Sequence, residues 1–155
     1  MPPASRCASW DGPQCSPGGQ PGRLDELIAP LVSEHAPGLV ALYGIGPHTA
    51  ALLLIAAGAH PGRLRSEAAW AHLCAAAPIP ASSGKVTRHR LNPGGDRQAN
   101  HALWWIVFTR MGSDPATRAY VERRTSEGKS KAEITRCLKR YVAREACPHL
   151  RPPTG

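Results

Sequence analysis

The chain has 155 residues, which is enough for one domain with a hydrophobic core and hardly enough for two. It carries 19 Lys and Arg against 11 Asp and Glu, and this net charge of +8 favours an anionic partner such as nucleic acid. No apolar run reaches the roughly 18 to 20 residues of a membrane span, and the N-terminus lacks the apolar core of a signal peptide. We therefore expect a cytoplasmic protein, and the five irregularly spaced cysteines predict reduced thiols and no metal site.

The abundance of Ala and Leu predicts a mainly α fold. Residues 1–22 are rich in Pro, Gly and Ser without periodicity and are expected to be disordered, as is the tail over 148–155. An amphipathic helix is expected over 23–34, with a break at Pro30 and with its apolar residues on one face. That face consists of Leu24, Leu27, Ile28 and Leu31.

Further helices follow along the chain. A helical stretch over 39–42 precedes a third helix that Pro47 begins and Gly58 closes. Residues 81–95 are predicted as a loop or a short hairpin. The remaining helices are expected over about 66–76, 96–111, 114–127 and 130–147, where Pro148 ends the last. Each begins at a residue that can cap it, namely Ser66, Asp96, Asp114 and Ser130.

The segment 42–50 is typical of a helix-hairpin-helix element. Gly44 and Gly46 let the backbone approach a phosphate, and the helix carrying His48 and Thr49 points its first amides at that phosphate. Such contacts position DNA without reading its sequence. An ordinary helical corner is the alternative that the pattern leaves open.

A hydroxyl beside a flexible glycine occurs at Ser82 and Ser83, and cations follow at Lys85, Arg88 and Arg90. A serine nucleophile for phosphoryl transfer needs nearby cations, because they offset the charge on the phosphate in the transition state. A polar turn contains the same residue types, so both interpretations stay open for this segment alone.

The last two helices are basic. From Arg118 to Arg144 nine cations face three glutamates, a net of +6, so the acids are too few to pair most of the bases. A surface for the phosphate backbone, with Lys129 and Lys131 as candidates, is favoured over a merely solvated face.

In this order the segments resemble one family, the insertion-sequence transposases of the IS-one-ten and IS-one-sixteen group, described as bridge-RNA-guided recombinases. The resemblance spans about 24–147. It is carried by LYGIGPHTA at 42–50, RLRSEA at 63–68, ASSGK at 81–85 with Arg88 and Arg90, LNPGGDRQAN at 91–100 with Arg97, YVERR at 120–124 and GKSK at 128–131.

The resemblance implies an enzyme with two catalytic parts. A RuvC-like domain of ribonuclease-H fold holds magnesium through four acidic residues, and a helical coiled-coil region joins it to a C-terminal transposase domain that carries a nucleophilic serine. The serine attacks a DNA phosphodiester and forms a phosphoserine link, while a bridge RNA pairs with donor and target DNA. By position Ser83 is implied as the nucleophile, with Ser82 as the alternative. The implied nucleic-acid-binding residues are Gly44, Gly46, His48, Thr49, Lys85, Arg88, Arg90, Arg97, Lys129 and Lys131.

The sequence departs from the family in two ways. Nothing before Arg23 could build the magnesium-binding domain, and Tyr43 stands where the family has Pro before the first hairpin glycine. We expect a truncated copy without a cofactor of its own, which binds DNA and bridge RNA, assembles with itself or an intact transposase, and does not recombine DNA unaided. A stand-alone DNA-binding module without catalysis and an inactive remnant are the alternatives.

Overall fold

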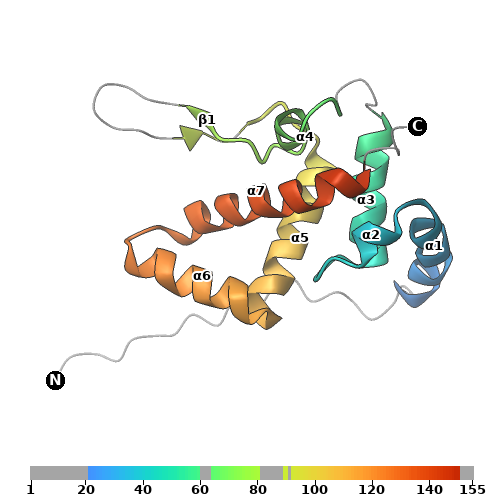
Figure 1. The fold of residues 1–155 in the computed structure, drawn as a ribbon, viewed down its shortest axis with the longest axis horizontal. Coiled ribbons are helices and arrows are strands. Elements are labelled where there is room, and N and C mark those ends of the chain that lie inside the picture. The colour runs from blue at the N-terminus through green and yellow to red at the C-terminus, as the bar shows by residue number, and fades with distance from the viewer. Residues whose placement is uncertain (1–20, 60–63, 81–88, 91, 151–155) are drawn as a thin grey trace.

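The structure is a computed structural model that describes residues 21–59, 64–80, 89–90 and 92–150. Within these ranges the chain is mainly helical, which confirms the predicted fold class (Figure 1). Of the disorder expected over 1–22, residues 1–20 lie outside the described residues, while α1 begins at Pro21, two residues before the expected start at Arg23. The elements are α1 (Pro21–His35), α2 (Pro37–Val40), α3 (Pro47–Ala59), α4 (Glu67–Leu73), β1 (Ile79–Pro80), β2 (His89–Arg90), α5 (Arg97–Ser113), α6 (Pro115–Ser126) and α7 (Lys131–Leu150).

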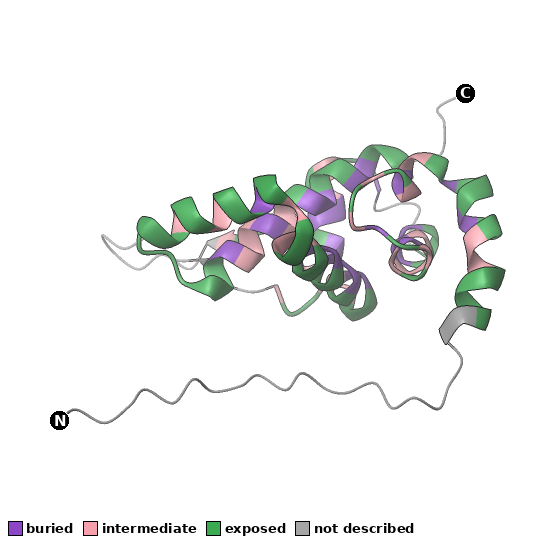
Figure 2. Cartoon of the chain, turned by 90° about the horizontal axis from the view of Figure 1, so that it is seen from below, coloured by how far each residue is buried: buried purple, intermediate pink, exposed green. Residues whose placement is uncertain are grey.

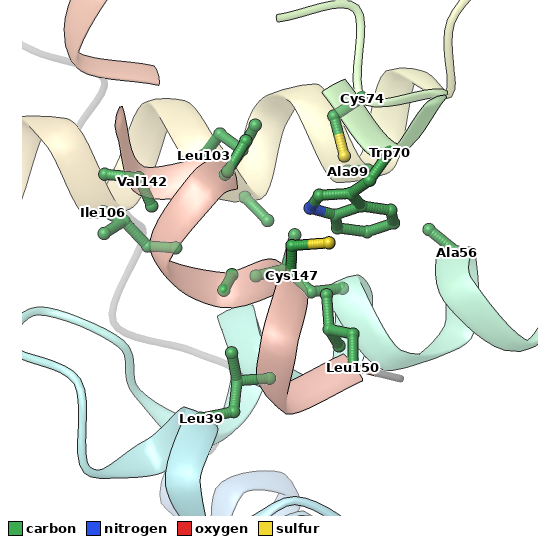
Figure 3. Packing of buried hydrophobic residues seen from close by; sticks show 14 of the residues in the cluster. Leu39, Ala56, Trp70, Cys74, Ala99, Leu103, Ile106, Val142, Cys147 and Leu150 are labelled. Atoms are coloured by element: carbon green, nitrogen blue, oxygen red, sulfur yellow. The ribbon is translucent and has the colours of Figure 1, made fainter. Parts of the chain in front are cut away.

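Helix α5 is the centre of the fold, and α3, α6 and α7 pack against it (Figure 1). It contributes Leu103, Ile106 and Val107 to the core, all at most 1% exposed. The C-terminal half of α7 crosses α5 and reaches α2 and α3. Figure 3 shows the indole of Trp70, from α4, pointing towards Cys147 of α7, in an apolar cluster to which α2, α3 and α5 also contribute.

The predicted helix starts are confirmed by their hydrogen bonds. Ser66 Oγ accepts from Ala69 N at 3.1 Å, and the carboxylates of Asp96 and Asp114 accept from the amides three residues on at 2.8 and 3.0 Å. At α7 the bonds are reciprocal, because Ser130 Oγ accepts from Glu133 N and the Glu133 carboxylate accepts from Ser130 N. These caps satisfy amides that have no partner inside the helix.

Two expected helix breaks, at Pro30 and Gly58, are wrong. Helix α1 continues through Pro30, an exposed residue, where water can satisfy the carbonyl that the missing N–H leaves without a partner. Helix α3 likewise continues past Gly58 to Ala59, since the buried Ala56 and Ala57 pack this end against the core.

The expected end of the last helix before Pro148 is also wrong. Helix α7 continues to Leu150, three residues into the segment expected to be a tail. Cys147 and Leu150 are both buried, so packing holds the last turn although Pro148 lacks an N–H.

The apolar face expected on α1 is largely solvent-exposed. Leu24, Leu27 and Leu31 are 55%, 64% and 59% exposed, whereas Val32 is the residue of α1 that enters the core. Figure 2 shows exposed residues along most of this helix. The amphipathic pattern therefore predicts the helix correctly but not which of its residues are buried.

Strands β1 and β2 form a short antiparallel hairpin, in which β2 lies within the loop or hairpin expected over 81–95 and β1 comes just before it. Ile79 pairs with Arg90, and Pro80 pairs with His89. The hairpin lies beside α4, near the N-terminal end of α5 (Figure 1). No helix in the described part of the chain is both long and apolar enough to cross a membrane.

Candidate nucleic-acid interface

The predicted serine segment belongs to the connection between β1 and β2. Ser82, Ser83, Lys85 and Arg88 lie outside the described residues. The described part of the site consists of residues 92–100, which hold the two strands and which we call the frame, and of the cations around them.

The segment 92–96 attaches the hairpin to the C-terminal end of α4. Asn92 Nδ2 donates to the carbonyl of His72 at 3.0 Å, while Asn92 Oδ1 accepts from Gly94 N at 3.0 Å. Asp96 N donates to the carbonyl of Leu73 at 2.6 Å. The last carbonyls of a helix have no partner within it, so this segment caps α4 and is fixed by doing so.

A close approach of two backbones explains Gly95. A Cβ at this position would lie 2.6 Å from both the N and the Cβ of Ala75. Ala75 itself has a φ of +54°, and this left-handed turn ends α4 earlier than the expected Ala76. Only a glycine allows the chain that leaves the hairpin to pass this turn.

Asn100 joins α5 to both α4 and α7. Its Nδ2 donates to the carbonyl of Cys74 at 2.8 Å, and its Oδ1 accepts from Lys139 Nζ at 3.0 Å. Burial and the neighbouring charge of Arg136 lower the pKa of Lys139. Lys139 is thus held inside the frame by one amide oxygen and is not exposed to a ligand in the manner of a surface lysine.

Part of the basic surface expected on α7 is neutralised. Arg140 forms an ion pair with Glu67 at the first residue of α4, and Arg144 Nε lies 3.6 Å from the same carboxylate. The hydrogen bond from Arg140 lowers the pKa of Glu67, and the charge of Arg144 adds to this effect. Glu67 lies far from 118–144 in the sequence, so the charges of that segment alone do not indicate this pair.

Other cations in this region stay available. Arg118, Lys129 and Lys131 are exposed and form no ion pair with any described residue. Arg97 is exposed at the first residue of α5, next to the base of the hairpin, and Arg90 lies in β2.

Gly44 is explained by the fold. It has a φ of +77°, and a Cβ there would lie 3.2 Å from Arg110 Cγ and 3.5 Å from the carbonyl oxygen of Ile106. Arg110 Nε donates to the carbonyl of Tyr43 at 2.8 Å and so fixes the turn onto α5. The close contact that Gly44 permits is with α5.

Gly46 and the start of α3 are more open. Nothing described lies within 4 Å of the position where Gly46 would carry a Cβ, and His48 is exposed. Thr49 Oγ1 donates to the carbonyl of Gly46 at 3.0 Å, which fixes the entry to the helix. A phosphate could approach the first amides of α3 here, as the sequence predicts.

The structure does not bring the glycine turn and the two lysines together. Arg110, which holds the turn, also pairs with Glu145 of α7 at 2.8 Å. Glu145 lies fourteen residues after Lys131, which corresponds to roughly 20 Å along the helix axis. The predicted residues therefore form separate contact points and not a single pocket.

No three His, Cys, Asp or Glu side chains lie together among the described residues as a group that could hold a metal ion. The resemblance implies magnesium in the acidic domain of the family and not among these residues.

The chain is similar to proteins of transposable elements. Residues 38–122 match a transposase family described as IS116/IS110/IS902. Over 110 residues the chain is 34% identical to an uncharacterised 43.6 kDa protein of insertion element IS110 from Streptomyces coelicolor, covering 69% of this chain and 27% of that relative. It is 27% identical over 107 residues to an uncharacterised 42 kDa protein of insertion element IS900 from Mycobacterium paratuberculosis, covering 68% of this chain and again 27% of the relative. The chain thus spans about a quarter of the length of these relatives.

The two glycines of the frame give a first prediction. Gly95→Ala should lower the free energy of unfolding by roughly 1–3 kcal/mol, because the added methyl meets backbone atoms of Ala75 that cannot move aside. Gly94→Ala is the matched control, since its methyl would meet only Asn92 Oδ1 at 3.5 Å. Urea denaturation of both variants measures the difference, and equal stabilities would contradict the close approach.

The ion pairs of Glu67 give a pH dependence. Its pKa is lowered below the ordinary value of 4.5, so its contribution to stability is complete above about pH 4.5 and is lost as the pH falls through the lower pKa of the folded state. Melting temperatures measured from pH 6 to pH 3 should therefore fall more steeply for the unmodified chain than for Glu67→Gln. Glu122→Gln, at an exposed position without an ion pair to a described residue, should leave the slope unchanged. Parallel curves for the chain and Glu67→Gln would count against the pairing.

Proposed function

The chain belongs to the IS116/IS110/IS902 transposase family, as its resemblance to the C-terminal domain of that family predicts, and we propose that it provides the DNA-binding, serine-bearing part of such an enzyme. The whole relatives are larger, so the complete reaction is proposed to need residues beyond this match.

One observation carries the proposal. Residues 92–100, which follow the serine segment, are the frame that ties the hairpin to three helices through Asn92, Gly95 and Asn100. A nucleophile requires supports that hold it to within a fraction of an ångström, and side chains fixed by hydrogen bonds and packing provide this. The frame therefore supports a catalytic role for the residues that the hairpin carries.

The proposed chemistry is a phosphoryl transfer to serine. The hydroxyl oxygen of Ser83 forms a bond to the phosphorus of a DNA phosphodiester and loses its proton. One phosphorus–oxygen bond of the strand breaks, and the strand end leaves as a hydroxyl after taking up a proton. Lys85, Arg88 and Arg90 offset the negative charge of the transition state.

The proposed DNA surface is wider than the reacting phosphate. Arg97 lies next to the base of the hairpin, Lys129 and Lys131 lie at the start of α7, and the first amides of α3 follow Gly46. Separate contact points suit a duplex, whose phosphates continue along its whole length. A bridge RNA and further transposase subunits, which would hold any magnesium, complete the proposed assembly.

A DNA-binding module without catalysis is the second candidate. The exposed cations at the start of α7 and the open entry to α3 support it, because neither needs the serine to bind a phosphate. The two candidates differ in covalent chemistry, which separate experiments can measure.

Binding to duplex DNA tests what the candidates share. The full chain should bind a fluorescent duplex, with an affinity that falls steeply between about 50 and 200 mM salt. Replacing both Lys129 and Lys131 by Ala should weaken binding and lower the slope of log affinity against log salt by about 2, one for each lost phosphate contact. Arg23→Ala, at an exposed position outside the proposed surface, is the control. A chain that shows no binding even at low salt would remove both candidates.

Covalent capture separates them. The full chain is mixed with labelled DNA, the acidic domain of a relative and the guide RNA of that relative, and adducts are resolved by denaturing electrophoresis and mass spectrometry. The adduct should disappear in Ser83→Ala and persist in the matched control Ser82→Ala. Loss in Ser82→Ala alone would transfer the role to the neighbouring serine, and an adduct that survives both changes would exclude the serine mechanism.

A further inference from the structure

Helix α5 carries a row of exposed aromatic side chains opposite its buried face. Trp104, Trp105 and Phe108 are 38%, 46% and 57% exposed, while the residues beside them in the sequence, Leu103 and Ile106, are fully buried. If apolar side chains of this helix were all buried, these rings would lie in the core as well. Their exposure leaves a surface that the proposed serine chemistry does not use.

The rings contact one another. Trp104 and Phe108 are stacked with centroids 5.3 Å apart and planes 15° from parallel, and His101 stacks on Trp104 at 6.2 Å. Trp105 meets Trp104 and Phe108 edge to face, at 5.2 and 6.0 Å. The row is thus an ordered aromatic surface, in which each ring limits the rotation of the next.

The chemistry of this face differs from that of an aliphatic docking surface. Its exposed apolar side chains are all aromatic, and its other exposed residues are polar or small. The polar and small residues are Arg97, Gln98, His101, Thr109, Gly112 and Ser113. Helix α1, with its exposed leucines, shows the aliphatic kind in the same molecule.

Charge also selects the partner of this face. Helix α5 contains no Asp or Glu, its exposed cation is Arg97, since Arg110 is paired with Glu145, and the whole chain has a net charge of +8. A second copy of the chain would bring like charge to this face. A polyanion with flat, apolar bases matches both the charge and the rings.

The row also begins at the proposed site. Arg97 is the first residue of α5, and the start of this helix is bonded through Asp96 and Asn100 to the C-terminal end of α4, to which Asn92 also attaches the base of the hairpin. From Arg97 to Phe108 the helix rises about 16 Å, which is the length of roughly four or five stacked bases.

We propose that the aromatic row of α5 is a stacking platform for unpaired bases of the DNA strand whose phosphate reaches the hairpin. This inference rests on the proposed function, and it adds a single-stranded segment to the substrate. Every base has a flat face, so the platform would hold the strand without selecting its sequence.

Tryptophan fluorescence of the full chain tests the platform with an oligothymidylate of about 20 nucleotides and, separately, a duplex. The single strand should quench the fluorescence. Trp105→Ala should weaken its binding roughly 5- to 150-fold and leave duplex binding unchanged. Trp105→Phe should restore much of the affinity, whereas Trp105→Leu, which keeps apolar area but no ring, should not. Ile55→Ala, an exposed apolar position on α3, is the matched control.

The outcomes are distinguishable. Duplex binding together with single-strand binding that ignores Trp105→Ala would overturn the platform and leave the proposed function standing. If the unmodified chain binds neither the single strand nor the duplex, the proposed function itself is overturned. A change of sedimenting mass in Trp105→Ala without a change in single-strand affinity would make the row a protein interface, and tighter binding of an oligouridylate would assign it to RNA. Either result would overturn the inference.

Discussion

The side-chain amide of Asn100 is the interaction on which the arrangement of the candidate site depends. Its two ends are chemically different, and each has the partner it requires: the nitrogen donates to a carbonyl at the end of α4, and the oxygen accepts from Lys139 of α7. In a partly buried position neither group can return to water cheaply, so the three helices are fixed relative to one another. The base of the hairpin takes its position from this junction, because Asp96 is bonded to the same end of α4.

The hydrogen bonds of Asn100 also help to give α5 one buried face and one exposed face. One face is held by α3, α6 and α7 and places Leu103 and Ile106 in the core. Because these neighbours and the Asn100 junction fix the rotation of the helix about its axis, the opposite face must turn Trp105 and Phe108 to solvent. Exposed aromatic surface lowers solubility, and a fold that keeps it at a fixed place points to binding rather than to packing.

Local features of this fold could be predicted from the sequence, and tertiary ones could not. Ser66 and Asp96 were identifiable as helix caps because the bonded amide is three residues away. Pro148 predicts the wrong end for the last helix, because the burial of the apolar side chains next to it outweighs one missing hydrogen bond. The pair of Glu67 with Arg140 joins residues 73 positions apart, which no local pattern reports. Ser83 depends on the resemblance alone, since a serine beside a glycine is common in turns.

The ion pairs change what the charge of +8 means for binding. Four arginines lie within ion-pair distance of glutamates, namely Arg110, Arg124, Arg140 and Arg144. Their charges are therefore partly neutralised by contacts within and between helices. Exposed cations without an ion pair to a described residue include Arg97 at the start of α5 and Lys129 and Lys131 at the start of α7. A long polyanion can touch these separated points at once, whereas a compact anion could reach only one. The distribution of unpaired charge, more than its sum, is therefore what favours nucleic acid as the partner.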